Sequence, residues 1–134
     1  MAKRLAAGIL YALFIGLLRP CLHIFGYART KRLLQRLSPS TRDPGLARHN
    51  ARTVAYAVRT LPVYRLVPAT CLHKSLFLWW FLHWFRLPSE VVTGVSRDPG
   101  IGRISFHAWV ESDGVPINDT ADVGDRFKKL DFMN

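Results

Sequence analysis

Three residues in the second half of the chain are of the types that carry out acyl transfer. Cys71 begins an apolar run, His107 lies in a segment of alternating residues, and Asp119 follows a turn containing glycine. Cysteine attacks as a thiolate, and a nearby histidine held by a carboxylate supplies the base that the thiolate needs. Cys71, His107 and Asp119 are therefore candidate catalytic residues of a cysteine-dependent acyl-transfer site.

An apolar helix is expected to position the cysteine. Residues 71–85 are apolar on nearly every side, which is typical of a helix at the centre of a domain, and Thr70 can cap its start through its hydroxyl. Cys71 is then the first helical residue. The helix dipole and the free N–H groups of the first turn favour a thiolate at that position.

A small antiparallel sheet is expected to position the other two residues. The alternation predicts strands over residues 90–97, 103–111 and 115–119, with a turn at 98–100 and a hairpin loop at 112–114. A three-residue loop with glycine in third place sets His107 directly opposite Asp119, within reach of the imidazole Nδ1. A two-residue loop would instead oppose His107 to Thr120 and turn Asp119 to the other face.

The N-terminal half is expected to be helical. Apolar spacing predicts helices over residues 3–18, 22–37 and 46–60, with a break at Arg19-Pro20 and a loop over 38–45. Helices followed by an antiparallel meander make an α+β fold, with the cysteine-bearing helix packed on the sheet. We expect a basic, apolar helical region over residues 1–45 and a catalytic core over 46–134.

Charge is divided unevenly along the chain. The 134 residues carry a net charge of +10, and residues 1–68 hold twelve Lys and Arg against a single acid, Asp43. Residues 69–134 hold seven basic and eight acidic residues. A basic half is typical of a face that meets a membrane surface, a nucleic acid or an acidic partner. The two cysteines are too few for a disulfide scaffold.

The uncharged stretch over residues 5–18 is short for a membrane span. Fourteen helical residues reach about 21 Å, less than the roughly 30 Å of a hydrocarbon core. A buried or membrane-surface helix is favoured over a span and over a cleaved signal peptide, because no small-residue cleavage site follows.

Structural interpretations compete with the catalytic one. Cys71 can be a small core residue, His107 a histidine packed among aromatics, and Asp119 a turn residue. A zinc site formed by Cys71, His73 and His107 lacks a compact ligand pair, so neither a metal nor a cofactor is predicted. Cys21 is expected to be structural.

The motifs resemble those of a known family. The sequences Ala69-Thr70-Cys71-Leu72-His73-Lys74-Ser75-Leu76 and Phe106-His107-Ala108-Trp109-Val110-Glu111, with Gly94 between them and Asn118-Asp119 after them, resemble the stand-alone leader peptidases of lasso-peptide biosynthesis. That family is similar in fold to bacterial transglutaminases. The resemblance covers about residues 50–130 and implies Cys71 as nucleophile, His107 as base and acid, and Asp119 as the orienting carboxylate.

The resemblance also implies substrate and partners. The substrate would be a ribosomally made precursor peptide, and the partners a separate winged-helix protein that binds the leader and an asparagine-synthetase-like cyclase. The expected location is the cytoplasm, with peripheral attachment to a membrane through the N-terminal region, and no nucleic acid is expected. The alternatives are a transglutaminase-like acyl transferase and a non-catalytic basic adaptor for a membrane surface or a nucleic acid.

Overall fold

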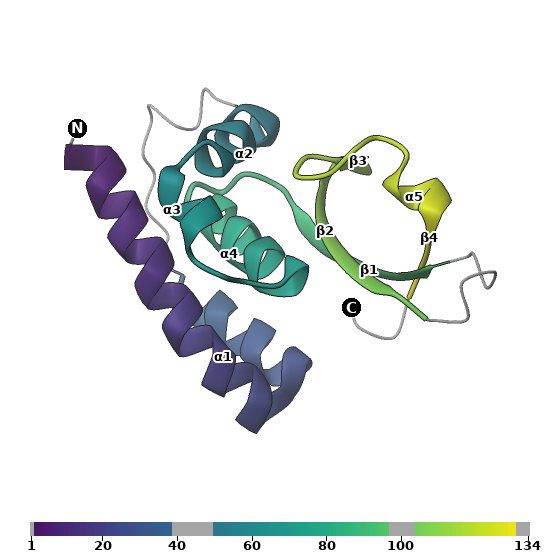
Figure 1. The fold of residues 1–134 in the computed structure, drawn as a ribbon, viewed down its shortest axis with the longest axis horizontal. Coiled ribbons are helices and arrows are strands. Elements are labelled where there is room, and N and C mark those ends of the chain that lie inside the picture. Colours follow the sequence, from purple (N-terminus) through teal and green to yellow (C-terminus); the bar gives the residue numbers. More distant parts are fainter. Residues whose placement is uncertain (1, 39–49, 97–103, 131–134) are drawn as a thin grey trace.

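A computed structural model describes residues 2–38, 50–96 and 104–130, and the side chains of residues 2–4 are not described. Within these ranges the chain forms an α+β fold, as predicted, with an antiparallel sheet in the order β3-β2-β1-β4 (Figure 1). The elements are α1 (Ala2–Arg36), α2 (Ala51–Arg59), α3 (Pro62–Leu66), α4 (Cys71–Trp84), β1 (Glu90–Ser96), β2 (Phe106–Ser112), β3 (Val115–Pro116), α5 (Val123–Arg126) and β4 (Phe127–Lys129).

Helix α4 lies between α1 and the sheet (Figure 1). Its middle is buried all round, as the apolar run predicts. Against α1, Phe77 meets the edge of Tyr11 with ring centroids 4.8 Å apart, and Trp80 meets Phe14 at 4.6 Å. The basic N-terminal half and the central helix therefore share one hydrophobic core. The boundary expected near residue 45 lies outside the described residues and stays a prediction.

Helix α1 reverses direction at Gly26, not at Arg19-Pro20. The helix continues through Pro20, so the predicted break there is wrong. Buried residues on the helical turns before Pro20, including Phe14 and Leu18, pack one face of the helix into the core. Gly26 has φ 74° and ψ 174°, a conformation that side chains disfavour, and the following residues fold back as a second arm. Across the reversal, the Thr30 hydroxyl donates a hydrogen bond to the Cys21 carbonyl at 3.1 Å.

The sheet is curled and packs on both faces. Val91 and Val110 lie in the core that includes α4, whereas Val92 and Trp109 face the other way and pack with Val123 of α5. Figure 1 shows the chain passing from β3 over the curl of the sheet to α5, after which β4 pairs with β1. His107 contacts this second core through Trp109 and Phe127.

Several element bounds differ from the sequence-based prediction. The third predicted helix begins at Ala51, because the Asn50 side chain accepts a hydrogen bond from the Thr53 N–H and caps it there. The third predicted strand contains two residues, not five. Helices α3 and α5 and strand β4 were not predicted, since each is only three to five residues long and shows no periodicity. The predicted turn over residues 98–100 lies outside the described residues.

We predict that Gly94→Ala destabilises the protein by about 1–3 kcal/mol. A Cβ at Gly94 would lie 3.0 Å from the Lys128 carbonyl oxygen and 3.1 Å from the Trp109 ring, and neither can move without disturbing the sheet. Gly16→Ala is the control, because nothing lies within 4 Å of a Cβ there and alanine favours a helix. Urea unfolding measures both; equal stability of the two variants would contradict the prediction.

Candidate active site

Cys71 lies at the first position of α4, as predicted. The Thr70 side chain caps the helix by accepting a hydrogen bond from the His73 N–H at 3.4 Å. The Cys71 thiol is free and partly exposed, and it lies at the positive end of the helix dipole. This environment suits a nucleophilic thiolate.

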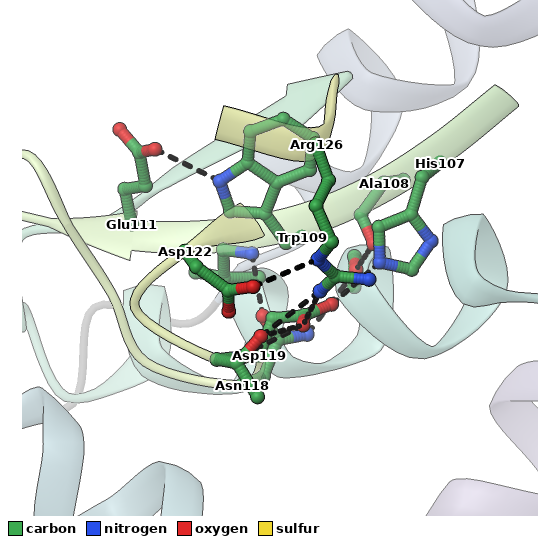
Figure 2. Close-up of polar contacts among 11 residues, drawn as sticks. His107, Ala108, Trp109, Glu111, Asn118, Asp119, Asp122 and Arg126 are labelled. Carbon is green, nitrogen blue, oxygen red and sulfur yellow. Dashed lines mark hydrogen bonds and ion pairs between the residues drawn. The ribbon is translucent and has the colours of Figure 1, made fainter. Parts of the chain in front are cut away.

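His107 and Asp119 form a direct pair. The imidazole Nε2 and the carboxylate Oδ2 are 2.5 Å apart, with 26% and 18% of the two side chains exposed (Figure 2). The carboxylate thus binds Nε2 and not Nδ1, so the predicted ring nitrogen is wrong. Nδ1 is then the ring nitrogen that would exchange a proton with a thiol.

The hairpin register differs from the one used to predict this pair. Ser112 pairs with Val115, so the loop is the two-residue Asp113-Gly114 turn, in which both residues have positive φ. The predicted three-residue loop is therefore wrong. In the observed register a continued ladder would oppose His107 to Thr120, which was the arrangement expected to separate His107 from Asp119.

The pair forms because the β2–β3 ladder stops at Pro116. The Ile117 N–H still bonds to the Val110 carbonyl at 2.9 Å, but the Val110 N–H donates to the Asn118 side-chain oxygen at 2.7 Å. Asn118 thus supplies from its side chain the acceptor that a strand would supply from its backbone. The chain is free to leave the ladder, and Asp119 turns back to His107.

A second side chain completes this edge of β2. The Ser75 hydroxyl of α4 donates to the Ala108 carbonyl at 3.0 Å, and the Asn118 amide donates to the Ser75 hydroxyl at 3.3 Å. Both Ala108 and Ser75 are buried. We call Ser75, Asn118 and the Ala108 and Val110 backbone groups the edge network.

The edge network ties together the three elements that hold the candidate residues. Ser75 lies one helical turn after Cys71, Ala108 follows His107, and Asn118 precedes Asp119. The start of α4 is thereby held at the edge of β2 that carries the His107–Asp119 pair. Cys71 is placed by its helix: among the described residues, no hydrogen bond joins its thiol to His107.

Asp119 is held from both sides. While Oδ2 bonds His107, Oδ1 accepts the Thr120 N–H at 2.7 Å and lies 3.3 Å from Nη2 of Arg126. Arg126 also pairs with Asp122 at 3.2 Å (Figure 2). Burial raises the pKa of the Asp119 carboxyl, but the hydrogen bonds from His107 and Thr120 together outweigh it, so the net pKa is lowered. Asp119 therefore stays ionised.

Aromatic rings support the imidazole. His107 packs against Phe127 in a tilted geometry with centroids 4.9 Å apart, and it is stacked with Trp109 at 6.0 Å. The Trp109 indole N–H donates to Glu111 at 2.8 Å, and Glu111 pairs with Lys129 of β4 at 2.8 Å. Sequence reasoning assigned no role to Glu111 or Arg126, although the alternation of positions 107, 109 and 111 already placed these three side chains on one face.

The remaining candidates do not join this site. Cys21 is a free, partly buried cysteine of α1. His73 approaches Thr70 through Nδ1, and burial together with the charge of Arg19 lowers its pKa. His83 stacks on Trp79. In the part of the chain that the structure describes, no three His, Cys, Asp or Glu side chains are grouped as metal ligands.

Comparison with known protein families identifies the superfamily of the chain. The family model described as the transglutaminase-like superfamily matches residues 15–131, so the chain belongs to the transglutaminase-like superfamily. Its members are usually cysteine-dependent enzymes. No curated protein and no solved structure gives a significant match.

We predict that Asn118→Ala and Ser75→Ala are coupled. Asn118→Ala leaves the Val110 N–H without its acceptor and should cost about 1–3 kcal/mol of unfolding free energy. Because Ser75 belongs to the same network, the double variant should deviate from additivity by about 0.5 kcal/mol or more. Thr60→Ala at the C-cap of α2, whose hydroxyl donates to the Ala57 carbonyl, should combine additively with Asn118→Ala. Additive loss in both cycles would contradict the edge network.

We predict that Asp119→Asn weakens the dependence of the unfolding free energy on pH at acidic pH. A carboxyl whose pKa is lower in the folded state stabilises the protein above its unfolded pKa, near 3.9, and this contribution is lost as pH falls through the folded pKa. The parent should therefore lose more stability than the variant between about pH 5 and about pH 3. Urea unfolding at several pH values measures this, and a parallel pair of profiles would refute it.

Proposed function

We propose that the protein is a cysteine peptidase that removes the leader from a ribosomally made lasso-peptide precursor. The main support is the His107–Asp119 hydrogen bond at the sheet edge where the cysteine-bearing helix α4 begins. Membership of the transglutaminase-like superfamily favours cysteine-dependent acyl chemistry at this edge. The motifs around Cys71 and His107 resemble those of the stand-alone leader peptidases, and this resemblance supports the choice of substrate.

In the first step the Cys71 thiolate attacks the carbonyl carbon of the last leader residue. The oxyanion that forms can accept a hydrogen bond from the Cys71 backbone N–H at the helix start. His107, after taking the thiol proton, donates it to the departing amine as the C–N bond breaks. The products are a thioester on Cys71 and a core peptide with a free amino terminus.

In the second step water resolves the thioester. His107 takes a proton from water, the oxygen attacks the thioester carbonyl, and the C–S bond breaks to release the leader as a carboxylate. Asp119 stabilises the imidazolium that forms in both steps, and Arg126 and Thr120 hold the carboxylate in place. Phe127 packs against the imidazole ring.

The same proposal includes partners and location. A separate winged-helix protein would present the leader, and an asparagine-synthetase-like cyclase would use the new amine. The peptidase would work in the cytoplasm, where precursor peptides are made.

A second candidate is a transglutaminase-like acyl transferase, which the superfamily assignment favours. It would form the same thioester and pass the acyl group to an amine instead of water. Product mass separates the two, since hydrolysis adds one water across the cut bond and transfer joins two molecules. A non-catalytic adaptor would show no selective alkylation of Cys71 by iodoacetamide at neutral pH.

We predict that Cys71→Ala abolishes leader cleavage while the folded state remains. Alanine removes the nucleophile, and the partly exposed site tolerates loss of one sulfur atom. Cys21→Ala is the matched control, because Cys21 is also free and partly buried but lies in α1. Each variant is incubated with the precursor peptide and the purified recognition protein, and mass spectrometry measures how much of the precursor is cleaved. Cleavage at the parental rate by Cys71→Ala would end the proposal.

A further inference from the structure

One face of α1 is apolar and turned outward. Leu5, Ile9, Leu13 and Leu17 follow one another at intervals of four residues and are 54–69% exposed, and Ile24 continues the row at 68%. We call these five residues the apolar face. Exposed apolar surface of this extent is rare on proteins that have no partner for it.

The opposite face of the same helix is occupied. Tyr11, Phe14 and Leu18 are buried, and the first two pack against the rings of α4. Helix α1 is apolar and long enough to cross a membrane by length and composition, and 22% of its most apolar window is buried. A helix that spanned the bilayer would lose its contacts with α4 or draw α4 in with it. A helix that lies along the surface keeps them.

The surroundings of the apolar face are basic. On the second arm of α1, three exposed arginines, Arg29, Arg32 and Arg36, line a hollow together with Phe25 and Leu33. At the other end, Leu66 is 79% exposed and lines a groove with Leu5 and Ile9, next to Arg65. Residues 2–38 and 50–89 contain neither Asp nor Glu.

We propose that α1 and its second arm lie in the headgroup region of an anionic lipid membrane. The apolar face enters the acyl boundary, and the arginines contact lipid phosphates, as in other interfacial helices. The exposed arginines at the end of this apolar face suit lipid phosphates, which an apolar protein surface does not supply. In this orientation the sheet lies on the far side of α4 from the membrane (Figure 1), so the His107–Asp119 pair stays in water. This inference is independent of the proposed peptidase activity.

Flotation of the full chain with lipid vesicles tests the proposal. Vesicles of phosphatidylcholine with phosphatidylglycerol should carry the protein upward, and phosphatidylcholine alone should do so much less. The triple variant Ile9→Ser/Leu13→Ser/Leu17→Ser should lose binding. The variant Arg29→Gln/Arg32→Gln/Arg36→Gln should bind anionic vesicles up to about a hundredfold more weakly. Circular dichroism confirms folding, which these exposed positions should tolerate.

The matched control replaces three exposed apolar residues elsewhere. Tyr56→Ser/Ile104→Ser/Val115→Ser should bind as the parent does. Equal loss in the control, or no binding by the parent, would overturn the proposal. Alkaline carbonate should release the protein, and retention would show a span instead. If the parent stays off vesicles and is a dimer that the serine variant of α1 dissociates, as light scattering would show, the apolar face joins two copies.

Discussion

Two backbone groups at the edge of β2 determine how the candidate site is assembled. The Val110 N–H and the Ala108 C=O would normally be paired by a neighbouring strand, but β3 ends before it reaches them. A buried backbone group without a partner costs about 1–3 kcal/mol, so the fold must satisfy both. Side chains from two distant segments, Ser75 and Asn118, do this. Ser75 lies in the helix that presents Cys71, and Asn118 directly precedes Asp119, so the hydrogen bonds that satisfy the edge also position the site.

The opposite face of the sheet imposes a second constraint. The Trp109 ring reaches over Gly94 of β1, where a Cβ would lie 3.1 Å from the ring, so a side chain at this position would collide with it. The indole is then fixed by Glu111, which Lys129 of β4 holds in turn. His107 lies two residues along the same strand face, at the rim of this packing. Its ring therefore contacts Phe127 and Trp109, and its Nε2 is bound by Asp119.

Features set by neighbouring residues can be predicted from the sequence, and features set by contacts between residues far apart in the chain cannot. The apolar run and Thr70 are local signals, and α4 begins where they indicate. The break at Gly26 was not foreseen, because proline is the stronger local signal and the packing that carries the helix through Pro20 is not visible in the sequence. The contact of His107 with Asp119 was expected for an incorrect reason. Its cause, a ladder that ends early, depends on Ser75, which is 33 residues from its bonding partner Ala108.

The shared core shows how the basic half and the near-neutral half of the chain are joined. The basic half and the near-neutral half form one packed unit, because the contact of α1 with α4 is made by aromatic and aliphatic side chains. The basic residues of the first half and the mixed charges of the second half are thus parts of a single packed unit. Near the site, Arg126 is engaged by Asp119 and Asp122, so its charge is largely balanced there. A protonated His107 would therefore face the Asp119 carboxylate directly, while Arg126 is shared between Asp119 and Asp122.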